Sequence, residues 1–280
     1  MAEQLTGKEV SSAVKERLAE KVKTLTQADK TPTLAILRVG ERPDDLSYER
    51  SAMKVADTLG IAVRSFVLAA EAAQSEIEAA IDEINADDSI HGCLMFRPLP
   101  KGIDETALCN RLDARKDMDG IGLGSLAGVF AGTGQGYAPC TAQACIEICE
   151  HYNVPVQGKH VVVIGRSLVI GKPVAMLFLQ RNATVTICHS RSENLAEITR
   201  GADIVVCATG RAKAYGAEYF SAGQTVLDVG INVDENGNLC GDVDFAAVEP
   251  IVGAITPVPR GVGSVTTALL MEHVVDAASK

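Results

Sequence analysis

The 280-residue sequence predicts a two-domain α/β protein, and three observations carry this prediction. Amphipathic helical patterns alternate with short apolar runs, which is typical of a parallel sheet flanked by helices. A passage with seven glycines and few charges after Asp119 runs from Lys116 to Gly136 and predicts the connection between the domains. In the second half, the β-branched run Val161–Ile164 is followed by Gly165, then by Gly171 and Pro173 at the start of a helical pattern. This order predicts a buried strand, a glycine turn and a helix.

Composition limits the classes of partner. The chain is 47% hydrophobic and 22% charged, which suits a globular protein with an ample core. A net charge of −10, few aromatics and no Trp argue against nucleic acid as a partner. The sequence contains no run of about 18 apolar residues, so we expect no membrane-spanning helix. The N-terminus shows no apolar signal region, so we expect a cytoplasmic protein.

The first half of the chain alternates helix and strand. Val10, Val14, Leu18 and Val22 recur at helical spacing, and Gly60 lies where a helix C-cap is expected. The predicted elements are helix Lys8–Leu25, strand Thr33–Val39, a polar loop Gly40–Asp45, helix Ser47–Leu59, strand Ile61–Leu68, helix Ser75–Asn85, strand His91–Phe96 and helix Asp104–Leu112.

The second half repeats this alternation around the glycine turn. The predicted elements are helix Thr141–His151, strand Val161–Ile164, helix Val174–Gln180, strand Ala183–Cys188, helix Leu195–Gly201, strands Ile204–Ala208, Thr225–Val229 and Gly253–Pro257, and helix Thr266–Ala278. Because the last helix follows the glycine segment 259–263, we expect it to return to the first domain. The predicted division is therefore 1–138 plus 265–280, an N-terminal α/β substrate domain, and 139–264, a Rossmann-like domain.

The eight cysteines do not form a metal-binding pattern. None lies in a C-x-x-C motif, and only Cys145 and Cys149 share the four-residue spacing of one helix face. We expect buried thiols in a reducing compartment and no metal site, with a metal pair at these two positions as the alternative.

The glycine turn predicts a phosphate site. A strand–turn–helix unit leaves backbone N–H groups available to an anion at the helix N-terminus, so Gly165, Arg166 and Ser167 are candidates to hold a pyrophosphate. The glycines are six residues apart and do not form G-x-G-x-x-G, so an ordinary tight turn is the alternative.

The end of the next strand bears on the choice of cofactor. In a dinucleotide-binding unit, an acidic residue there suits NAD, whereas basic or hydroxyl residues suit the extra phosphate of NADP. Here the position holds His189, Ser190 and Arg191, with no carboxylate before Glu193. Together with Arg166, Arg191 offers guanidinium groups for one phosphate, so we expect NADP and keep NAD as the alternative. A solvated loop with a chance arginine would give the same sequence.

Several motifs in order give the chain a family resemblance. They are VGERPDDLSY, RPLP, KDMDG, GRSLVIGKPVAMLFL, ATVTICHSRS, ADIVVCATG, VLDVGIN and ITPVPRGVG. With these motifs the chain resembles the methylenetetrahydrofolate dehydrogenase/cyclohydrolase family over nearly its whole length. The resemblance implies a cleft between two α/β domains, folate on the N-terminal domain, NAD(P) on the other, and a homodimer formed through the nucleotide-binding domain.

The sequence departs from that family at its proton-transfer residues. The family pattern of Tyr, three residues and Lys is met by Tyr48 and then Ala52, while Lys54 matches a second, non-catalytic lysine. The glutamine expected before the proline motif is Phe96. The family's PGGVGPMT becomes Pro259–Thr266 with Arg260 in place of a glycine, and PCTP becomes Pro139–Ala142.

The resemblance also implies roles for individual residues. Tyr48 and Asp119 are the catalytic candidates, with Tyr48 near the reacting carbon and Asp119 accepting hydrogen bonds from the pterin ring; a helix-face tyrosine and a turn cap are the alternatives. The substrate-binding candidates are Tyr48, Ala52, Phe96, Asp119, Pro259, Arg260, Gly261, Val262 and Gly263. The cofactor-binding candidates are Gly165, Arg166, Ser167, His189, Ser190, Arg191, Thr209, Gly210, Gly230, Ile231 and Thr266.

The two family reactions make different demands. Hydride transfer from the methylene carbon needs position and electrostatics, whereas hydrolysis of the methenyl cation needs proton transfer. We therefore expect NADP-dependent oxidation of 5,10-methylenetetrahydrofolate with weak or absent cyclohydrolase activity. Dehydrogenase-only members of the family prefer NAD, which keeps that cofactor open. An oxidoreductase of this fold acting on a different one-carbon or iminium substrate also fits the departures, as does a silent paralogue that binds nucleotide or folate.

Overall fold

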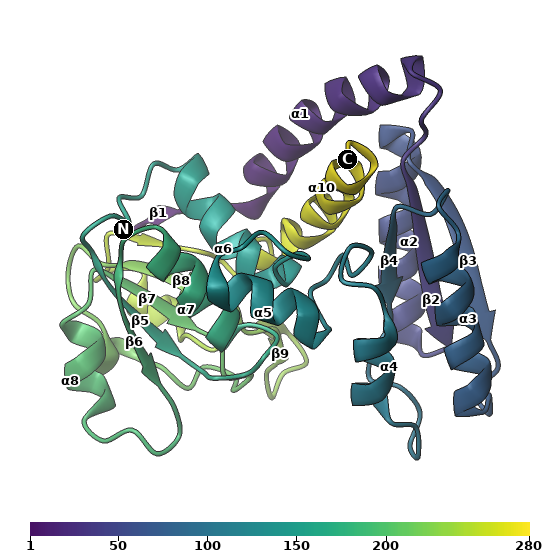
Figure 1. Cartoon of the computed structure of the whole chain (residues 1–280). Helices are drawn as coiled ribbons and strands as arrows, with labels where there is room; N and C mark the ends of the chain where they lie inside the picture. Colours follow the sequence, from purple (N-terminus) through teal and green to yellow (C-terminus); the bar gives the residue numbers. More distant parts are fainter. The chain divides into compact units, whose positions relative to one another are not determined.

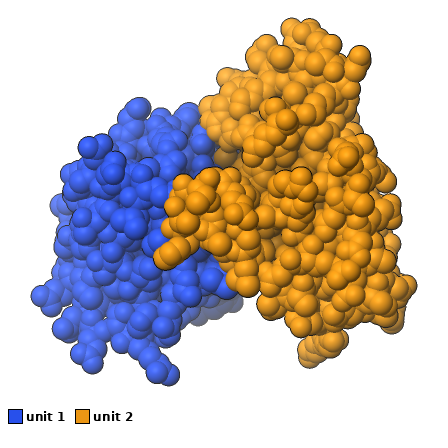
Figure 2. Space-filling model, in the orientation of Figure 1, with its two compact units in different colours: residues 1–12, 141–266 blue, residues 13–140, 267–280 orange.

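The computed structural model describes residues 1–280 and divides them into two compact units, shown in Figure 2. Unit 1 comprises Met1–Ser12 and Thr141–Thr266, and unit 2 comprises Ala13–Cys140 and Thr267–Lys280. The first twelve residues differ from the sequence-based division, which assigned them to the N-terminal domain. Strand β1 (Glu3–Gln4) pairs in parallel with β11 (Ala254–Ile255), and these backbone hydrogen bonds hold the chain start in unit 1.

Unit 1 is built on a six-stranded sheet in the order β1-β11-β8-β7-β5-β6, in which every pairing is parallel (Figure 1). Its other strands are β5 (His160–Ile164), β6 (Thr184–Cys188), β7 (Ile204–Cys207) and β8 (Thr225–Asp228). The chain leaves β5 to β6 on one side and then passes to β7 on the other. This change of direction makes the carboxyl end of β5 a topological switch point, where open α/β sheets bind ligands.

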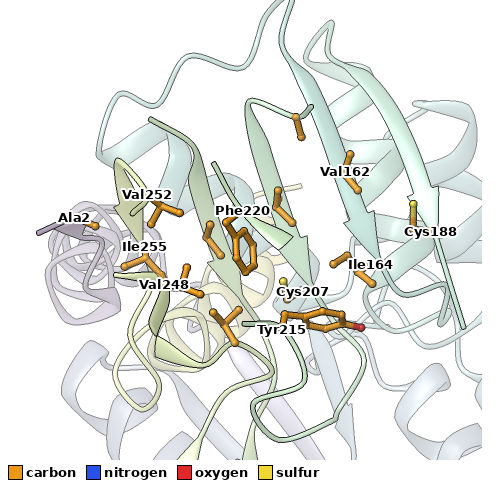
Figure 3. Close-up of a cluster of buried hydrophobic side chains, with 14 residues drawn as sticks. Ala2, Val162, Ile164, Cys188, Cys207, Tyr215, Phe220, Val248, Val252 and Ile255 are labelled. Carbon is orange, nitrogen blue, oxygen red and sulfur yellow. The ribbon is translucent and has the colours of Figure 1, made fainter. Parts of the chain in front are cut away.

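The remaining elements of unit 1 are short connections around this sheet. The helices are α6 (Cys140–His151), α7 (Gly171–Gln180), α8 (Leu195–Arg200) and α9 (Phe245–Val248), with 3₁₀ turns η1 (Ala217–Tyr219) and η2 (Val262–Ser264). Strands β9 (Asn232–Val233) and β10 (Leu239–Cys240) form a separate antiparallel hairpin. Figure 3 shows the buried side chains beside the sheet, among them Val162, Ile164, Phe220, Val248 and Ile255. Burying β5 on both faces explains its run of β-branched residues.

Unit 2 contains the three-stranded parallel sheet β3-β2-β4, with strands β2 (Thr33–Val39), β3 (Ala62–Leu68) and β4 (Gly92–Met95). Its helices are α2 (Pro43–Leu59), α3 (Gln74–Ala86), α4 (Glu105–Arg111) and α5 (Leu123–Ala131). The boundaries of the two units fall within α1 (Gly7–Gln27), at the start of α6 and at the start of α10 (Thr266–Ala278). Leu37 packs in the core that includes Ile77 and Ile81 of α3, whereas the neighbouring Arg38 bonds to Glu49 of α2. Because successive strand residues face opposite ways, α2 and α3 cover opposite faces of this sheet.

Two local predictions from the sequence are corrected, and three short strands were not predicted. The glycine-rich passage predicted as a connection contains α5, whose left-handed C-cap is Gly132. Helix α2 begins at Pro43 inside the predicted polar loop, because proline is favoured in the first turn of a helix. Strand β1 and the β9–β10 hairpin are not predicted from the sequence, since strands of two residues leave no detectable periodicity.

Two global features complete the fold. No helix combines the length and apolar character needed to cross a lipid bilayer. All eight cysteines are buried thiols, and no three His, Cys, Asp or Glu side chains are gathered as a set of metal ligands.

Candidate active site

The cofactor candidates of unit 1 lie at one edge of its sheet. Gly165 follows β5, His189 follows β6, Thr209 follows β7 and Gly230 follows β8. Since these neighbouring strands are parallel, their carboxyl ends meet at the same edge. The structure therefore brings together residues that are up to 65 positions apart in the sequence, at the switch point of the sheet.

The glycine turn is too tight for any side chain at its two glycines. Gly165 has φ of +135°, and a Cβ on this residue would lie 2.3 Å from the carbonyl oxygen of Ala208. A Cβ on Gly171 would lie 2.3 Å from the carbonyl oxygen of Gly165. The Ser167 hydroxyl accepts the Ile170 N–H at 3.2 Å, and Arg166 and Ser167 are exposed. An exposed, rigid turn at the N-terminus of α7 fits a pyrophosphate.

The loop after β6 places two polar side chains in solvent. The ring Nδ1 of His189 lies 3.2 Å from the Arg191 N–H that it accepts, and the Ser192 hydroxyl accepts the His189 N–H at 2.9 Å. His189 therefore shapes this turn, while Ser190 and Arg191 remain exposed at its tip. This arrangement fits an additional phosphate on the adenosine ribose, because an exposed guanidinium and hydroxyl are its preferred donors.

Asp242 organises the loop after β7, and sequence reasoning missed it. Its carboxylate accepts the N–H groups of Thr209, Gly210 and Arg211 at 2.5, 3.1 and 2.8 Å. It also accepts the Asn232 side-chain amide at 3.0 Å. The GDVD sequence gives no sign of this role, because the contact spans more than 30 residues.

Asp228 fixes the loop after β8 in a similar way. Its carboxylate accepts the N–H groups of Gly230, Asp242 and Val243 at 3.0–3.1 Å. Burial is the largest influence on this carboxyl and raises the pKa of Asp228 to about 7, although these amides oppose the shift. Neighbouring Ile231 is 67% exposed, which excludes core packing for that residue.

A cavity of about 160 Å³ opens beside this loop in unit 1. The residues that line it include Ile231, Leu239 and the segment Pro257–Ser264, so Pro259, Arg260, Gly261, Val262 and Gly263 are gathered here. The peptide bond before Pro259 is cis, and Arg260 has φ of +80°. Thr266 begins α10, and its hydroxyl donates to the Gly263 carbonyl at 3.2 Å.

In unit 2, Tyr48 packs against the aromatic ring of Phe96. Its ring meets the ring of Phe96 edge-on, with centroids 5.9 Å apart and planes at 85°. Ala52 on the same helix is fully buried, and Phe96 is 8% exposed. Lys54 is exposed and lies about 120° round the helix from Tyr48, whereas Ala52 lies about 40° from it. The positions that the family resemblance assigns to lysine and glutamine thus carry no titratable group.

A buried ion pair lies under the same helix and was not expected from the sequence. Arg38 Nε donates to Glu49 Oε2 at 2.7 Å, and the Arg38 guanidinium also bonds to the Gly40 carbonyl. Both side chains are nearly buried, with 8% and 10% exposed. Since Glu49 directly follows Tyr48, this pair anchors α2 to β2 at the residue next to the candidate catalytic tyrosine.

Asp119 stands in a turn that neighbouring residues hold rigidly. The Asp119 carboxylate accepts the Cys140 N–H at 3.1 Å, and the residue as a whole is partly exposed. Burial is the largest influence on it and raises its pKa. Asp117 is fully engaged, accepting the N–H groups of Ile121 and Gly122 and the Ser125 hydroxyl at 2.7–3.0 Å. Asp119 is therefore the acid of this turn that remains available to a ligand.

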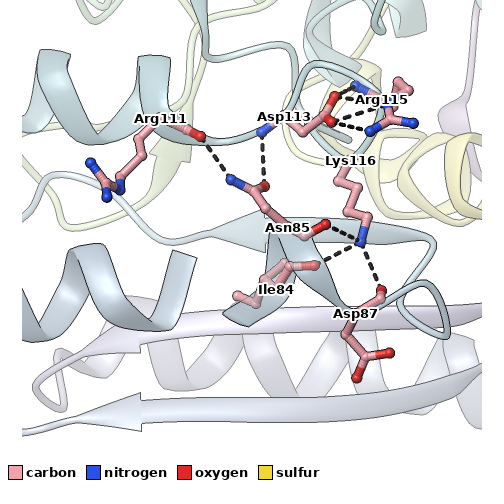
Figure 4. Close-up of polar contacts among 7 residues, drawn as sticks. All are labelled: Ile84, Asn85, Asp87, Arg111, Asp113, Arg115 and Lys116. Atoms are coloured by element: carbon pink, nitrogen blue, oxygen red, sulfur yellow. Dashed lines mark hydrogen bonds and ion pairs between the residues drawn. The ribbon is translucent and has the colours of Figure 1, made fainter. Parts of the chain in front are cut away.

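Lys116 of the same motif is structural. Figure 4 shows its ammonium group beside the end of α3, where it donates to the carbonyls of Ile84, Asn85 and Asp87 at 2.7, 3.1 and 2.8 Å. Burial lowers its pKa, but three backbone acceptors use all three of its N–H donors. Its amine is thus unavailable as a replacement for the family's proton-transfer lysine.

A buried histidine supports the Asp119 turn from α10. His273 Nδ1 lies 2.7 Å from the Met118 carbonyl and 3.9 Å from Cys140 Sγ. Burial lowers the pKa of His273, so its neutral form donates the hydrogen bond to Met118. Sequence reasoning missed this residue, because its contact with Met118 crosses 155 positions.

Comparison with known proteins agrees with this arrangement. Residues 5–119 match the tetrahydrofolate dehydrogenase/cyclohydrolase catalytic domain, and residues 139–280 match the NAD(P)-binding domain of the same family. Bifunctional protein FolD of Carboxydothermus hydrogenoformans is 51% identical over 279 residues, covering 99% of this chain and 97% of its own.

Solved structures give the same result. The bifunctional FolD methylenetetrahydrofolate dehydrogenase/cyclohydrolase of Campylobacter jejuni is 35% identical, with a TM-score of 0.96 over 100% of this chain and 99% of its own. The dehydrogenase-cyclohydrolase of Trypanosoma brucei, solved with NADP cofactor and an inhibitor, is 32% identical, with a TM-score of 0.92 over 99% and 97%. With both domains matched over nearly the whole chain, this protein belongs to the tetrahydrofolate dehydrogenase/cyclohydrolase family.

Proposed function

We propose that this protein oxidises 5,10-methylenetetrahydrofolate to 5,10-methenyltetrahydrofolate with NADP, and that it has weak or no cyclohydrolase activity. The two solved relatives described above carry names that include both activities, so the second part departs from those names. The observation that carries the proposal is the apolar packing beside Tyr48, where buried Ala52 and Phe96 supply neither the amine nor the amide that the family resemblance assigns to these two positions.

Oxidation makes little demand on proton chemistry. The methylene carbon loses a hydride, and the lone pairs of its two folate nitrogens stabilise the cation that forms, so no protein base is needed. When bound, the nicotinamide ring accepts the hydride. We assign substrate orientation to Asp119, a partly exposed residue whose carboxylate can accept N–H groups of the pterin ring. Tyr48 presents its ring beside the reacting carbon and helps to exclude water.

Ring opening depends more strongly on proton transfer than oxidation does. Water must add to the methenyl carbon and lose a proton, and a folate nitrogen must then gain one, so a positioned acid–base group accelerates the reaction. Alanine and phenylalanine cannot supply this group. The nearby Arg38 and Glu49 are committed to each other, and the Lys116 amine is bound by three carbonyls.

The choice of NADP rests on the exposed groups at the carboxyl edge of the unit 1 sheet. Arg166, Ser190 and Arg191 are exposed there, and no carboxylate precedes Glu193 after β6. A guanidinium contact to the additional phosphate on the adenosine ribose stabilises bound NADP and cannot form with NAD. These residues therefore favour NADP. We also propose a homodimer formed through unit 1, as the family resemblance implies; light scattering of the purified protein tests it.

Parallel assays on one purified sample test the proposal. Methylene oxidation is followed at the methenyl absorbance band with NADP or NAD, and hydrolysis is followed by the decay of added methenyl substrate. We expect oxidation that is faster with NADP and hydrolysis close to the buffer rate. Hydrolysis well above buffer would refute the loss of cyclohydrolase activity, and no oxidation with either cofactor would refute the substrate.

A further inference from the structure

Arg260 adopts a backbone conformation that an arginine rarely takes. Six non-glycine residues have positive φ: Asp29, Asn153, Asn182, Asn194, Lys213 and Arg260. Asp and Asn tolerate this region because their short side chains bond locally, but a long side chain is strained there. Among the long side chains, Lys213 forms an ion pair with Asp234 at 2.9 Å. Arg260 forms no such ion pair, so no charge contact within the protein compensates for the strain of its backbone conformation.

The surrounding backbone prevents Arg260 from relaxing. Its carbonyl accepts the Gly7 N–H at 2.8 Å. A Cβ on the next residue, Gly261, would lie 2.4 Å from the Pro257 carbonyl oxygen, and a Cβ on Gly7 would lie 2.0 Å from the Gly261 oxygen. Strain that persists because the neighbours over-determine the backbone is concentrated at ligand-binding positions.

The charge around Arg260 also points to a ligand. The cavity it lines contains one other ionisable residue, Asp228. That carboxylate already accepts the N–H groups of Gly230, Asp242 and Val243. The other lining residues are apolar or offer only hydroxyl and backbone groups, so Arg260 is the single cation at the cavity and forms no ion pair there.

We propose that the Arg260 guanidinium binds an anionic oxygen group of the molecule that enters this cavity. This inference rests on the proposed function, which gives the anionic group two sources: the glutamate carboxylates of the folate and the pyrophosphate of the cofactor. A guanidinium can hold either one through two parallel N–H donors. Because Arg260 is exposed, its effect on binding falls as salt screens the charge.

Three variants separate this role from a structural one. Arg260→Gly removes the guanidinium and supplies the residue best suited to φ of +80°, so its melting temperature should equal or exceed that of the wild type. Arg260→Lys keeps a charge and the strain. Lys213→Gly is the matched control, since it relieves positive φ at a residue outside the cavity.

Equilibrium titrations measure the dissociation constants of NADP, and of methenyltetrahydrofolate with one and with three glutamates, for each protein. We expect Arg260→Gly to weaken one ligand about three- to tenfold, with Arg260→Lys between it and the wild type and Lys213→Gly unchanged. A loss that grows with the number of glutamates assigns the site to folate carboxylates. A loss confined to NADP assigns it to the pyrophosphate.

Two results would overturn the inference. Arg260→Gly could bind every ligand as tightly as the wild type, or its melting temperature could fall while all affinities drop together, which would indicate a structural role. Turnover is measured separately. A wild type that fails to oxidise methylenetetrahydrofolate, yet binds with an Arg260-dependent constant, would refute the proposed function and leave this inference standing.

Discussion

The ring of Tyr48 meets the ring of Phe96 edge-on, with a centroid separation of 5.9 Å. Edge-to-face contact is a favoured arrangement of aromatic rings, and it restricts the orientation of the tyrosine ring. One turn further along α2, Ala52 is fully buried. The side chains beside Tyr48 therefore give packing and no proton transfer, which is the basis of the proposed loss of cyclohydrolase activity.

Restoring the two absent groups should restore ring opening. We expect Ala52→Lys with Phe96→Gln to hydrolyse methenyltetrahydrofolate at least about tenfold faster than the wild type, because a positioned acid–base group contributes roughly 10²–10⁴-fold when its placement is ideal. Burial lowers the pKa of a lysine, so the restored hydrolysis should become faster as pH increases toward neutral. Moving the amine to the exposed face, with Met53→Lys, is the control that should gain nothing. A folded double variant with wild-type hydrolysis would show that other parts of the site prevent the reaction.

Arg191 should discriminate between the cofactors. Replacing it by Ala removes a charge-assisted contact to the phosphate, and we expect the KM for NADP to rise roughly tenfold or more. The KM for NAD serves as the internal control and should change less than about twofold. Equal increases for both cofactors would mean that Arg191 supports the loop and does not recognise the phosphate.

The buried pair Arg38–Glu49 should be costly to break from one side. Glu49→Gln leaves the Arg38 guanidinium buried without a counter-charge, and we expect a loss of about 3 kcal/mol in the free energy of unfolding. The double change Arg38→Met with Glu49→Leu should recover most of this loss, since it removes both desolvated charges. Urea denaturation of the wild type, Glu49→Gln and the double variant measures these free energies; a double variant less stable than Glu49→Gln would contradict this account.

Asp228 should make stability depend on pH. The folded protein holds this proton up to about pH 7, whereas the unfolded chain releases it near pH 4. The stabilisation is therefore fully present at low pH and is lost as pH rises through this window, with a slope of at most about 1.4 kcal/mol per pH unit. Asp228→Asn does not ionise, so the unfolding free energy of the wild type should fall relative to that of the variant as pH rises from about 5 to 7. A difference independent of pH would mean that Asp228 is ionised throughout.

Local patterns predicted most of the fold. The β-branched run of β5, the glycine turn and the isoleucines of α3 each have a short-range pattern that only one element satisfies, and the structure has those elements. Helix α5 was missed because its glycines lower helix propensity, although Gly128 is required where the Gln135 backbone approaches it. The hairpin β9–β10 and strand β1 depend on partners far along the chain.

The candidate site divides in the same way. Residues within contiguous motifs, such as Arg166, Ser167 and Tyr48, could be named from the sequence. Asp242 and His273 could not, because they act through backbone groups more than 30 and 150 positions away. The positive φ of Arg260 is also a property of the folded backbone, so its strain is visible only in the structure.

The most direct test of the central claim is the ratio of two rates on one preparation: methylene oxidation with NADP and methenyl hydrolysis above buffer. We predict measurable oxidation and a hydrolysis rate close to the buffer rate across neutral pH. Hydrolysis at a rate comparable with oxidation would contradict the account, because it would show that ring opening does not need the lysine that the family resemblance places at Ala52.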